Sequence, residues 1–600
     1  MPNPEQKRSM TQLFGNPQES RQVIAPVKDA PIRQNLPKPS PQQQAILETR
    51  LAVGESMKVI AKAGAGKTTS MLMFSESKGE NARILYICFN TKGAEEARRR
   101  YQGAGIRNTE VLNVHRLATG VKKRYEDAEK FKSKITIKDA RNHNPRLDYS
   151  RAWTMMETIK NFCESDKTEI EKSHVPTIAY QDRPNWEALL EESLKDAQLF
   201  WKRMLDLKDV APVSFDHYLK IYELGNPKLN YDFILLDEGQ DSNPITINLL
   251  KKQADHTRIV LIGDPHQAIY KWRGAKNAMA EWDSKITVPL SESFRFGPEI
   301  AAAANVILKV FSDPEESIQG NRPMSKLGVV GPHEKHTLIA RTNGVLFETA
   351  LEQVAKGRKF HFVGTEASKK WDPSIPYRFD DAIDVFQLMQ WSIQQKAVAK
   401  FSAKVPEKPF LKNPHLRAFK DYDEIKQAAV GENGAKGDKE LESLCRIVEK
   451  YPTNLPILIE RVIKNCTSPE EANILLSTCH QAKGLEWPVV KMADDFTELV
   501  TRDDGAYHDR LVTAGNISDD NPLSQAFDTD DEEINLIYVA ITRAIEKLEL
   551  NPKCLELFRR TDLLPKHILN DPEFQKYLGG GQRRQAPREN PKNEMFQDIF

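Results

Sequence analysis

The sequence lacks long apolar runs, paired cysteines and an excess of either charge, and each absence excludes a class of protein. No stretch is long and apolar enough for a membrane-spanning helix, and the N-terminal residues lack the apolar core of a signal peptide. The six cysteines stand apart without a CxxC pair, which argues against a disulfide framework or a zinc site. The net charge is only +1 over 600 residues, so any contact with nucleic acid depends on local patches. We expect an intracellular, cytoplasmic protein of about three or four domains.

The loop at residues 61–69 organises the first half of the chain. It follows the apolar run 57–60 and precedes residues that can begin a helix. Gly64 and Gly66 permit backbone conformations in which successive N–H groups face one anion, and a helix N-terminus adds positive charge. Lys67 would then reach the terminal phosphates of a nucleotide, and Thr68 would bind Mg²⁺. A flexible Gly/Ala turn is the alternative, but it explains the Gly-Lys-Thr-Thr ending less well. ATP and Mg²⁺ are therefore the expected cofactors, and the predicted contacts of this loop are Ala63, Gly64, Ala65, Gly66, Lys67, Thr68 and Thr69.

Two carboxylates, Asp237 and Glu238, end the apolar run 231–236. Downstream of a phosphate-binding loop, one carboxylate is needed to hold Mg²⁺ and a second to orient and deprotonate the attacking water. Asp237 is assigned the first role and Glu238 the second. A solvated surface pair is the alternative, and the preceding buried-strand pattern argues against it.

Apolar runs alternate with helical patterns in both halves of the chain. This alternation predicts parallel sheets with ligands at the carboxyl ends of the strands. The runs that read as strands are 57–60, 84–90, 111–115, 231–238, 258–264, 337–341, 473–477 and 489–492. A helix is predicted over about 532–546.

Several blocks, in order along the chain, resemble the signature motifs of superfamily 1A helicases, the UvrD/Rep/PcrA group. They are residues 237–241, 263–275, 475–487 and 538–544. Residues 215–220 and the short second insertion are more similar to the helicase portion of F-box DNA helicases. A phage origin is one possible source of such a chain.

The resemblance implies an α/β protein with two RecA-like parallel-sheet P-loop domains, each carrying a mainly helical inserted subdomain. The expected boundaries are 1–39 for a disordered tail, 40–118 and 213–285 for domain 1A, 119–212 for insertion 1B, 286–367 and 471–565 for domain 2A, 368–470 for insertion 2B, and 566–600 for a C-terminal tail.

The same resemblance assigns further roles around the nucleotide. Gln43 would read the adenine edge, and Phe294 would stack on adenine. Gln267 would sense the γ-phosphate. Arg295 and Arg543, reaching in from the second α/β unit, would complete a charge clamp on the phosphates, and Glu486 would contact the sugar. The catalytic set is then Lys67, Asp237, Glu238, Gln267, Arg295 and Arg543.

Binding of single-stranded DNA without sequence preference requires aromatic stacking groups beside a basic track. Tyr270 and Trp272 lie within five residues of Gln267, among basic neighbours, so one loop can contact both phosphate and base. A core tryptophan is the alternative for Trp272. The resemblance adds Phe89, Asn90, Lys92, His115, Thr478 and His480 as DNA contacts. For the two histidines, satisfied core residues are an equally good interpretation.

These features and the resemblance predict an ATP-dependent motor on single-stranded DNA, acting in DNA repair, recombination or replication. The resemblance alone implies that it moves 3′ to 5′. Its expected partners are single-stranded and tailed duplex DNA, with no membrane. Two alternatives remain: a translocase that strips recombinase or other proteins with little strand separation, and an ATP-switched, clamp-associated DNA-binding module. Residues 595–600 resemble a sliding-clamp-binding peptide, although a short apolar end without a partner is the simpler interpretation.

Overall fold

The computed structural model describes part of the chain, which divides after Leu290 into two compact units. The described residues are 36–580 apart from 89, 134, 136–138, 142–146, 148, 177–185, 271–275, 313–314, 365–378, 400–406, 414–415, 418, 431–438, 498, 500–530 and 562. Most of the predicted N-terminal tail and residues 581–600, including the clamp-like peptide, lie outside them.

A six-stranded parallel sheet forms the centre of the first unit, in the order β3-β2-β4-β5-β1-β6. Its strands are β1 (Ser56–Ala61), β2 (Ile84–Cys88), β3 (Thr109–Asn113), β4 (Phe233–Asp237), β5 (Arg258–Gly263) and β6 (Ile286–Leu290). All five residues of β2 are buried, as expected for a strand covered by helices on both faces. The predicted α/β class with parallel sheets is confirmed.

The last strand of this sheet corrects a boundary. β6 pairs with β1 in parallel register, from Met57 opposite Ile286 to Ala61 opposite Leu290. Residues 286–290 therefore belong to the first unit, and the expected boundary after residue 285 was one strand too early. A local sequence pattern does not show which sheet a strand joins.

Several helices of the first unit follow residues whose side chains cap them. Ser40 accepts the backbone N–H of Gln43, and Pro41 occupies the first position of the first helix, as the sequence predicts. The helices around the sheet are α2 (Pro41–Glu48), α3 (Lys67–Ser77), α4 (Thr91–Gly103), α5 (Val114–Leu117), α10 (Phe215–Leu224), α11 (Pro244–Lys251) and α12 (Ala278–Glu281).

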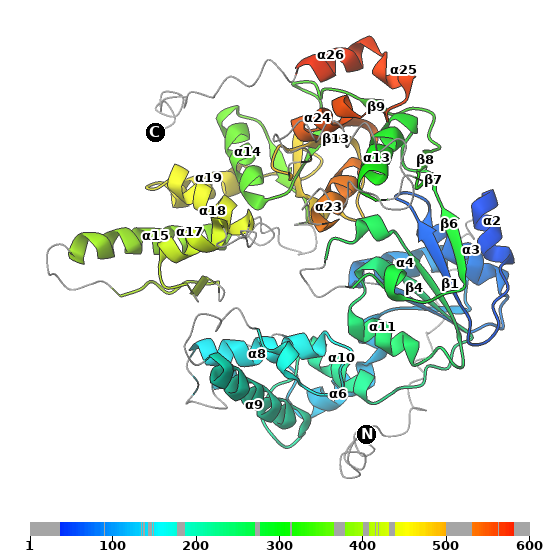
Figure 1. Ribbon diagram of the computed structural model, residues 1–600, viewed down its shortest axis with the longest axis horizontal. Coiled ribbons are helices and arrows are strands. Elements are labelled where there is room, and N and C mark those ends of the chain that lie inside the picture. Colours follow the sequence, from blue (N-terminus) through cyan, green and yellow to red (C-terminus); the bar gives the residue numbers. More distant parts are fainter. Residues whose placement is uncertain are drawn as a thin grey trace. The chain divides into compact units, whose positions relative to one another are not determined.

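The part of the chain between α5 and α10 that the structure describes is mainly helical, and it shares a core with the sheet. Its elements are α6 (Thr119–Asp127), α8 (Tyr149–Cys163), the 3₁₀ turn η1 (Lys172–His174) and α9 (Trp186–Leu205), with α8 packed along α9 (Figure 1). One apolar cluster contains both Phe162 of α8 and Leu236 of β4. The insertion is therefore built onto the sheet rather than tethered to it.

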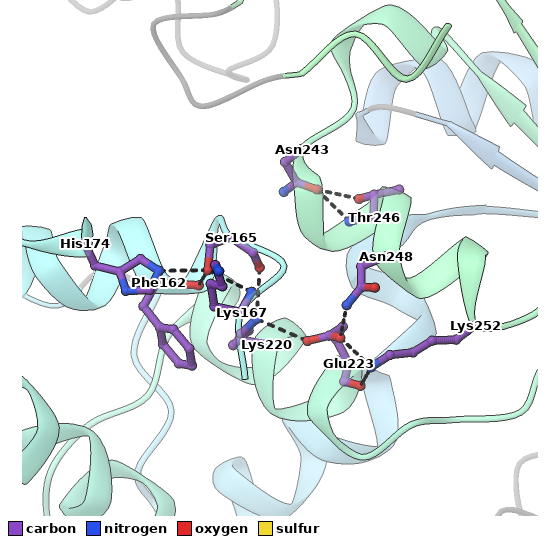
Figure 2. A network of polar contacts seen from close by, with 10 residues as sticks. All are labelled: Phe162, Ser165, Lys167, His174, Lys220, Glu223, Asn243, Thr246, Asn248 and Lys252. Carbon is purple, nitrogen blue, oxygen red and sulfur yellow. Dashed lines mark hydrogen bonds and ion pairs between the residues drawn. The ribbon is translucent and has the colours of Figure 1, made fainter. Parts of the chain in front are cut away.

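A buried ion-pair network joins the insertion to α10 and α11 (Figure 2). Lys220 and Glu223, both fully buried, lie 3.2 Å apart between Nζ and Oε2. Lys220 also donates to the backbone oxygen of Ser165, 2.9 Å away, just beyond α8. Glu223 accepts from Asn248 on α11, at 2.7 Å, and pairs with Lys252 at its end.

The charges in this network depend on one another. Burial lowers the pKa of Lys220, while the neighbouring carboxylate of Glu223 opposes that shift. A buried pair of this kind adds little net stability over an apolar pair, but removing one partner leaves an uncompensated buried charge.

The second unit is built on another six-stranded parallel sheet, in the order β11-β12-β10-β13-β14-β9. Its strands are β9 (Lys326–Leu327), β10 (His336–Ala340), β11 (Phe360–Phe362), β12 (Ile474–Thr478), β13 (Trp487–Met492) and β14 (Ala544–Glu549), and a short pair is formed by β7 (Glu292–Ser293) and β8 (Gln319–Gly320). The described residues between β11 and β12 include four helices that share a core with the sheet. They are α15 (Phe379–Ala399), α17 (Tyr422–Val430), α18 (Lys439–Lys450) and α19 (Leu455–Asn465).

Two predictions for the end of this unit were wrong. The helix expected over about 532–546 ends earlier, because α23 covers Asp531–Ile541 and β14 begins at Ala544. The charged sequence of β14 resembles a helix, and its pairing with β13 decides the outcome.

The expected tail from residue 566 is partly folded. α25 (Lys566–Leu569) and α26 (Pro572–Gly580) bury Phe574, and the Tyr577 hydroxyl donates to the backbone oxygen of Leu550 at 2.8 Å. The remaining helices are α13 (Pro298–Phe311), α14 (Asn343–Ala355), α20 (Cys479–Ala482) and α24 (Pro552–Arg560). Among the described residues, no helix combines the length and apolar character needed to cross a membrane.

Glu223→Gln is expected to lower the free energy of unfolding of the first unit by about 3–5 kcal/mol, because Lys220 loses its counter-charge. Replacing both residues, Lys220→Met with Glu223→Leu, should cost less than the single change. Urea denaturation of the full chain measures both values.

The matched control is Glu281→Gln, which breaks an exposed pair with Lys276. That change should alter stability by less than about 1 kcal/mol. Equal effects of Glu223→Gln and Glu281→Gln would contradict the buried-charge account.

Candidate nucleotide-binding site

The loop between β1 and α3 has the backbone shape of an anion site. Gly64 and Gly66 have φ angles of 73° and 75°, in the left-handed region that glycine enters without a Cβ penalty. Gly66 precedes α3 and supplies no side-chain cap, so the first N–H groups of the helix remain available to a ligand. Lys67 and Thr68 begin α3. The start of α3 can therefore receive a phosphate group.

Lys67 faces carboxylates. Its Nζ lies 3.1 Å from Oε1 of Glu238, and the lysine side chain is 13% exposed. Burial alone would lower the pKa of Lys67, but Glu238, Asp264 and Asp237 together raise it above its ordinary value. The lysine is therefore held in its charged form, as phosphate binding requires.

Glu238 follows β4 in a conformation that is uncommon for a residue with a side chain. Its φ and ψ are 53° and 45°, a left-handed geometry that costs about 1–2 kcal/mol. Its backbone N–H donates to Oδ1 of Asp237 at 2.9 Å. The turn brings the Glu238 carboxylate to Lys67, and strain of this kind is typical of functional sites.

Asp237, at the end of β4, has the donor chemistry of a cation ligand. The Tyr86 hydroxyl donates to its Oδ2 at 2.5 Å. Burial and the Glu238 charge raise the pKa of Asp237 to about 6, although Lys67 and the two hydrogen bonds oppose the shift. Burial raises the pKa of Tyr86 well above its ordinary value, so the phenol stays a donor. A carboxylate and the Thr68 hydroxyl are hard oxygen donors, and they fit Mg²⁺.

A chain of hydrogen bonds links the expected catalytic base to the expected phosphate sensor. Gln240 donates to Oε2 of Glu238 and accepts, through Oε1, the backbone N–H of Asp264 at 3.1 Å. Oδ2 of buried Asp264 accepts from Gln267 at 2.7 Å. Gly263 makes room for this chain, since a Cβ there would lie 2.3 Å from Oε1 of Gln240.

The expected adenine reader lies beside the same helix. Gln43 is buried, its Nε2 donates to the Ser70 hydroxyl at 3.0 Å, and its Oε1 accepts the Ser40 N–H at 3.0 Å. Thr69 accepts from Arg100 of α4 at 2.6 Å. Gln43, the loop, the acid pair and Gln267 thus all lie in the first unit.

The second unit brings together the other expected nucleotide residues. Arg295 pairs with Glu486 at 2.6 Å and donates to the backbone oxygen of Thr542 at 2.9 Å. Arg543 is 1% exposed, and its guanidinium donates to the backbone oxygens of Val539 and Leu485. Phe294, beside Arg295, is 46% exposed, as a stacking residue must be.

The expected DNA contacts are only partly described. Asn90 caps α4 by accepting the Gly93 N–H, and Lys92 follows it on the exposed first turn. His115 is half-buried, its ring centroid lies 6.1 Å from those of Phe215 and Tyr218, and burial lowers its pKa.

Of the remaining contacts, Tyr270 is half-buried, while Phe89 and Trp272 lie outside the described residues. In the second unit, Thr478 caps α20 by accepting the Gln481 N–H, and His480 lies in that helix. Asn90, Lys92, His115 and Tyr270 thus lie in the first unit, and Thr478 and His480 lie in the second.

Sequence reasoning missed several residues of the site, among them Tyr86, Gln240, Asp264 and Arg100. Asp264 follows β5, and its position at the end of a buried strand was a usable signal. Tyr86 is a polar-tipped aromatic residue in an otherwise apolar strand, which was a weaker signal. The bond from Arg100 to Thr69 joins positions 31 residues apart and had no sequence signal.

Comparison with known proteins identifies the family of the chain. The UvrD/REP helicase N-terminal domain matches residues 40–285, and the UvrD-like helicase C-terminal domain matches residues 380–551. Relatives include F-box DNA helicase 1 of Gallus gallus, 29% identical over 84% of this chain and 48% of that protein. F-box DNA helicase protein 1 of Schizosaccharomyces pombe is 28% identical over 86% of this chain and 58% of its own length. ATP-dependent DNA helicase PcrA of Bacillus subtilis is 23% identical over 85% of this chain and 82% of its own.

The chain spans about half the length of the F-box relatives that it matches. The two parallel sheets described above are the two RecA-like domains of the family fold. With both family domains matched in order along the chain, the protein belongs to the UvrD-like helicases.

Proposed function

We propose that the protein is an ATP-dependent 3′–5′ DNA helicase and single-stranded DNA translocase acting in DNA repair, recombination or replication. The observation that carries the ATP assignment is the pairing of Lys67 with Glu238 at the start of α3, beside Asp237. The family assignment supports DNA as the substrate. Polarity and pathway rest on the resemblance to superfamily 1A.

The charges around Lys67 suggest how nucleotide binding prepares hydrolysis. Lys67 is paired with Glu238, and ATP phosphates would compete for the same ammonium group. A phosphate bound to Lys67 would release the Glu238 carboxylate, which could then orient the attacking water and accept its proton. Asp237 and Thr68 would hold Mg²⁺, which supplies neutralisation of phosphate charge. The base is then available only when its substrate is present.

The hydrogen-bond chain from Glu238 to Gln267 supports a sensing role for Gln267. A change at the Glu238 carboxylate alters the partner of Gln240, and Gln240 bonds the backbone of Asp264, which holds Gln267. Tyr270 follows three residues later. Loss of the γ-phosphate would thus reach the expected DNA-contacting loop through three hydrogen bonds.

The second unit supplies the remaining roles. Phosphoryl transfer develops negative charge that cations must stabilise, and we assign Arg295 and Arg543 to that charge. Phe294 is assigned to adenine stacking and Glu486 to the sugar. Single-stranded and tailed duplex DNA are the assigned partners.

Lys67→Ala should reduce DNA-stimulated ATP hydrolysis by about 100-fold or more, because the phosphates lose their fixed cation. A phosphate-release assay with saturating single-stranded DNA measures it. Lys251→Ala, at an exposed lysine of α11, should retain wild-type turnover. Turnover of the Lys67 variant equal to that of the Lys251 variant would refute the site.

Arg295→Ala should lower kcat by about 10³-fold, as expected for an arginine that acts on transition-state charge. Binding of a fluorescent ATP analogue should change far less, because the phosphate loop is unaltered. Arg446→Ala, at an exposed arginine of the same unit, is the control. A loss of binding as large as the loss of kcat would contradict the assignment.

Duplexes with a 3′ or a 5′ single-stranded tail test polarity. The 3′-tailed duplex should be unwound with ATP and the 5′-tailed duplex should not, because a 3′–5′ motor loads on the 3′ tail. Displacement of a recombinase filament is measured in parallel. Efficient displacement without unwinding would replace the helicase proposal by a protein-stripping translocase, and ATP hydrolysis without either would favour an ATP-switched binding module.

A further inference from the structure

A fully buried tyrosine lies behind the acid pair on the neighbouring strand. β2 and β4 pair in parallel register, with Tyr86 opposite Leu235. Side chains two residues apart share a face of a strand, so Leu235 and Asp237 project on the same face as Tyr86. The Tyr86 phenol reaches along that face to the carboxylate at the strand end.

The presence of a buried hydroxyl at position 86 requires a physical explanation. Phenylalanine would fill almost the same volume, and a buried hydroxyl without a partner costs free energy. Its partner is Oδ2 of Asp237, at 2.5 Å, a distance typical of an O–H bond to an ionised carboxylate. The other residues of β2 are aliphatic apart from Cys88.

The two oxygens of Asp237 are held from two directions. Tyr86 donates to Oδ2 and the Glu238 backbone donates to Oδ1. A carboxylate has about four lone-pair positions, so each oxygen can still accept a ligand. The two donors thus orient the carboxylate without blocking it.

We propose that Tyr86 is a positioning residue of the ATP site, whose O–H orients the Asp237 carboxylate for Mg²⁺. This inference rests on the proposed function, in which Asp237 is the metal-binding carboxylate. Groups that orient metal ligands in this way commonly change metal affinity by about 10–100-fold when removed.

The chain offers a matched control. The ring of Tyr101, on α4, lies 5.5 Å from that of Tyr86 and is equally buried. Its hydroxyl contacts the Ser75 hydroxyl at 3.1 Å and the Met71 backbone oxygen at 3.2 Å, both on α3. Tyr101→Phe therefore removes a buried hydroxyl from the same core without removing a bond to Asp237.

The experiment measures binding of mant-ADP to the full chain, first in EDTA and then at stepped Mg²⁺ concentrations. In EDTA, the affinity of Tyr86→Phe for mant-ADP should stay within about twofold of wild type. The Mg²⁺ concentration that gives half of the maximal increase in mant-ADP binding should rise about 10-fold. Tyr101→Phe should match wild type in both. Excess Mg²⁺ should restore most of the ATPase turnover of Tyr86→Phe.

Equal Mg²⁺ midpoints for the two variants would overturn the inference while leaving the ATP site standing. If the affinity of the wild-type protein for mant-ADP does not change with Mg²⁺ concentration, both the metal role of Asp237 and this inference are overturned. If Tyr86→Phe is less stable, Tm is measured for each variant with ADP alone and with ADP plus Mg²⁺. The difference between the two Tm values of one variant is then independent of its lower starting stability. A smaller rise for Tyr86→Phe than for Tyr101→Phe supports the positioning role, and an equal rise refutes it.

Discussion

The ion pair between Lys67 and Glu238 joins the phosphate loop to the end of β4, and the surrounding arrangement depends on where parallel strands end. β5 lies between β1 and β4 in the sheet, so the carboxyl ends of these three strands are neighbours. The loop after β1 leads to Lys67, and the ends of β4 and β5 place three acidic groups near it. The lysine stays charged because those groups outweigh its burial. An anion that enters the loop meets a cation already paired, and it must compete with Glu238.

The uncommon backbone conformation of Glu238 makes this competition possible. The residue adopts a left-handed conformation without the freedom of glycine, and that conformation turns its carboxylate toward Lys67. Gln240 and Asp264 hold the same segment by hydrogen bonds. The strain is sustained by contacts that also connect the acid pair to Gln267.

Much of this site could be predicted from local sequence, because each motif occupies consecutive residues. The glycine conformations of the loop, the strand before Asp237 and the cap of α2 all follow from short patterns. Contacts between distant segments could not be predicted. The bonds of Tyr86 to Asp237 and of Arg100 to Thr69 depend on strand order and helix packing, which the sequence does not spell out.

The sheet that a strand joins also depends on contacts between distant segments, and it could not be predicted from local sequence. Residues 286–290 were expected to begin the second unit, and the pairing of β6 with β1 assigns them to the first. β14 reads as a charged helix, and pairing with β13 overrides that local preference.

The burial of Arg543 has a consequence for how its charge can be delivered. A long flexible side chain ordinarily searches many rotamers before it meets a ligand, and it loses that freedom on binding. Here the guanidinium donates hydrogen bonds to the carbonyls of Val539 and Leu485 and to the Thr542 hydroxyl. The side chain has therefore lost its rotamer entropy during folding, before any ligand binds. The positive charge is carried as part of the rigid junction between α23 and β14, and any displacement of that charge is a displacement of the junction itself.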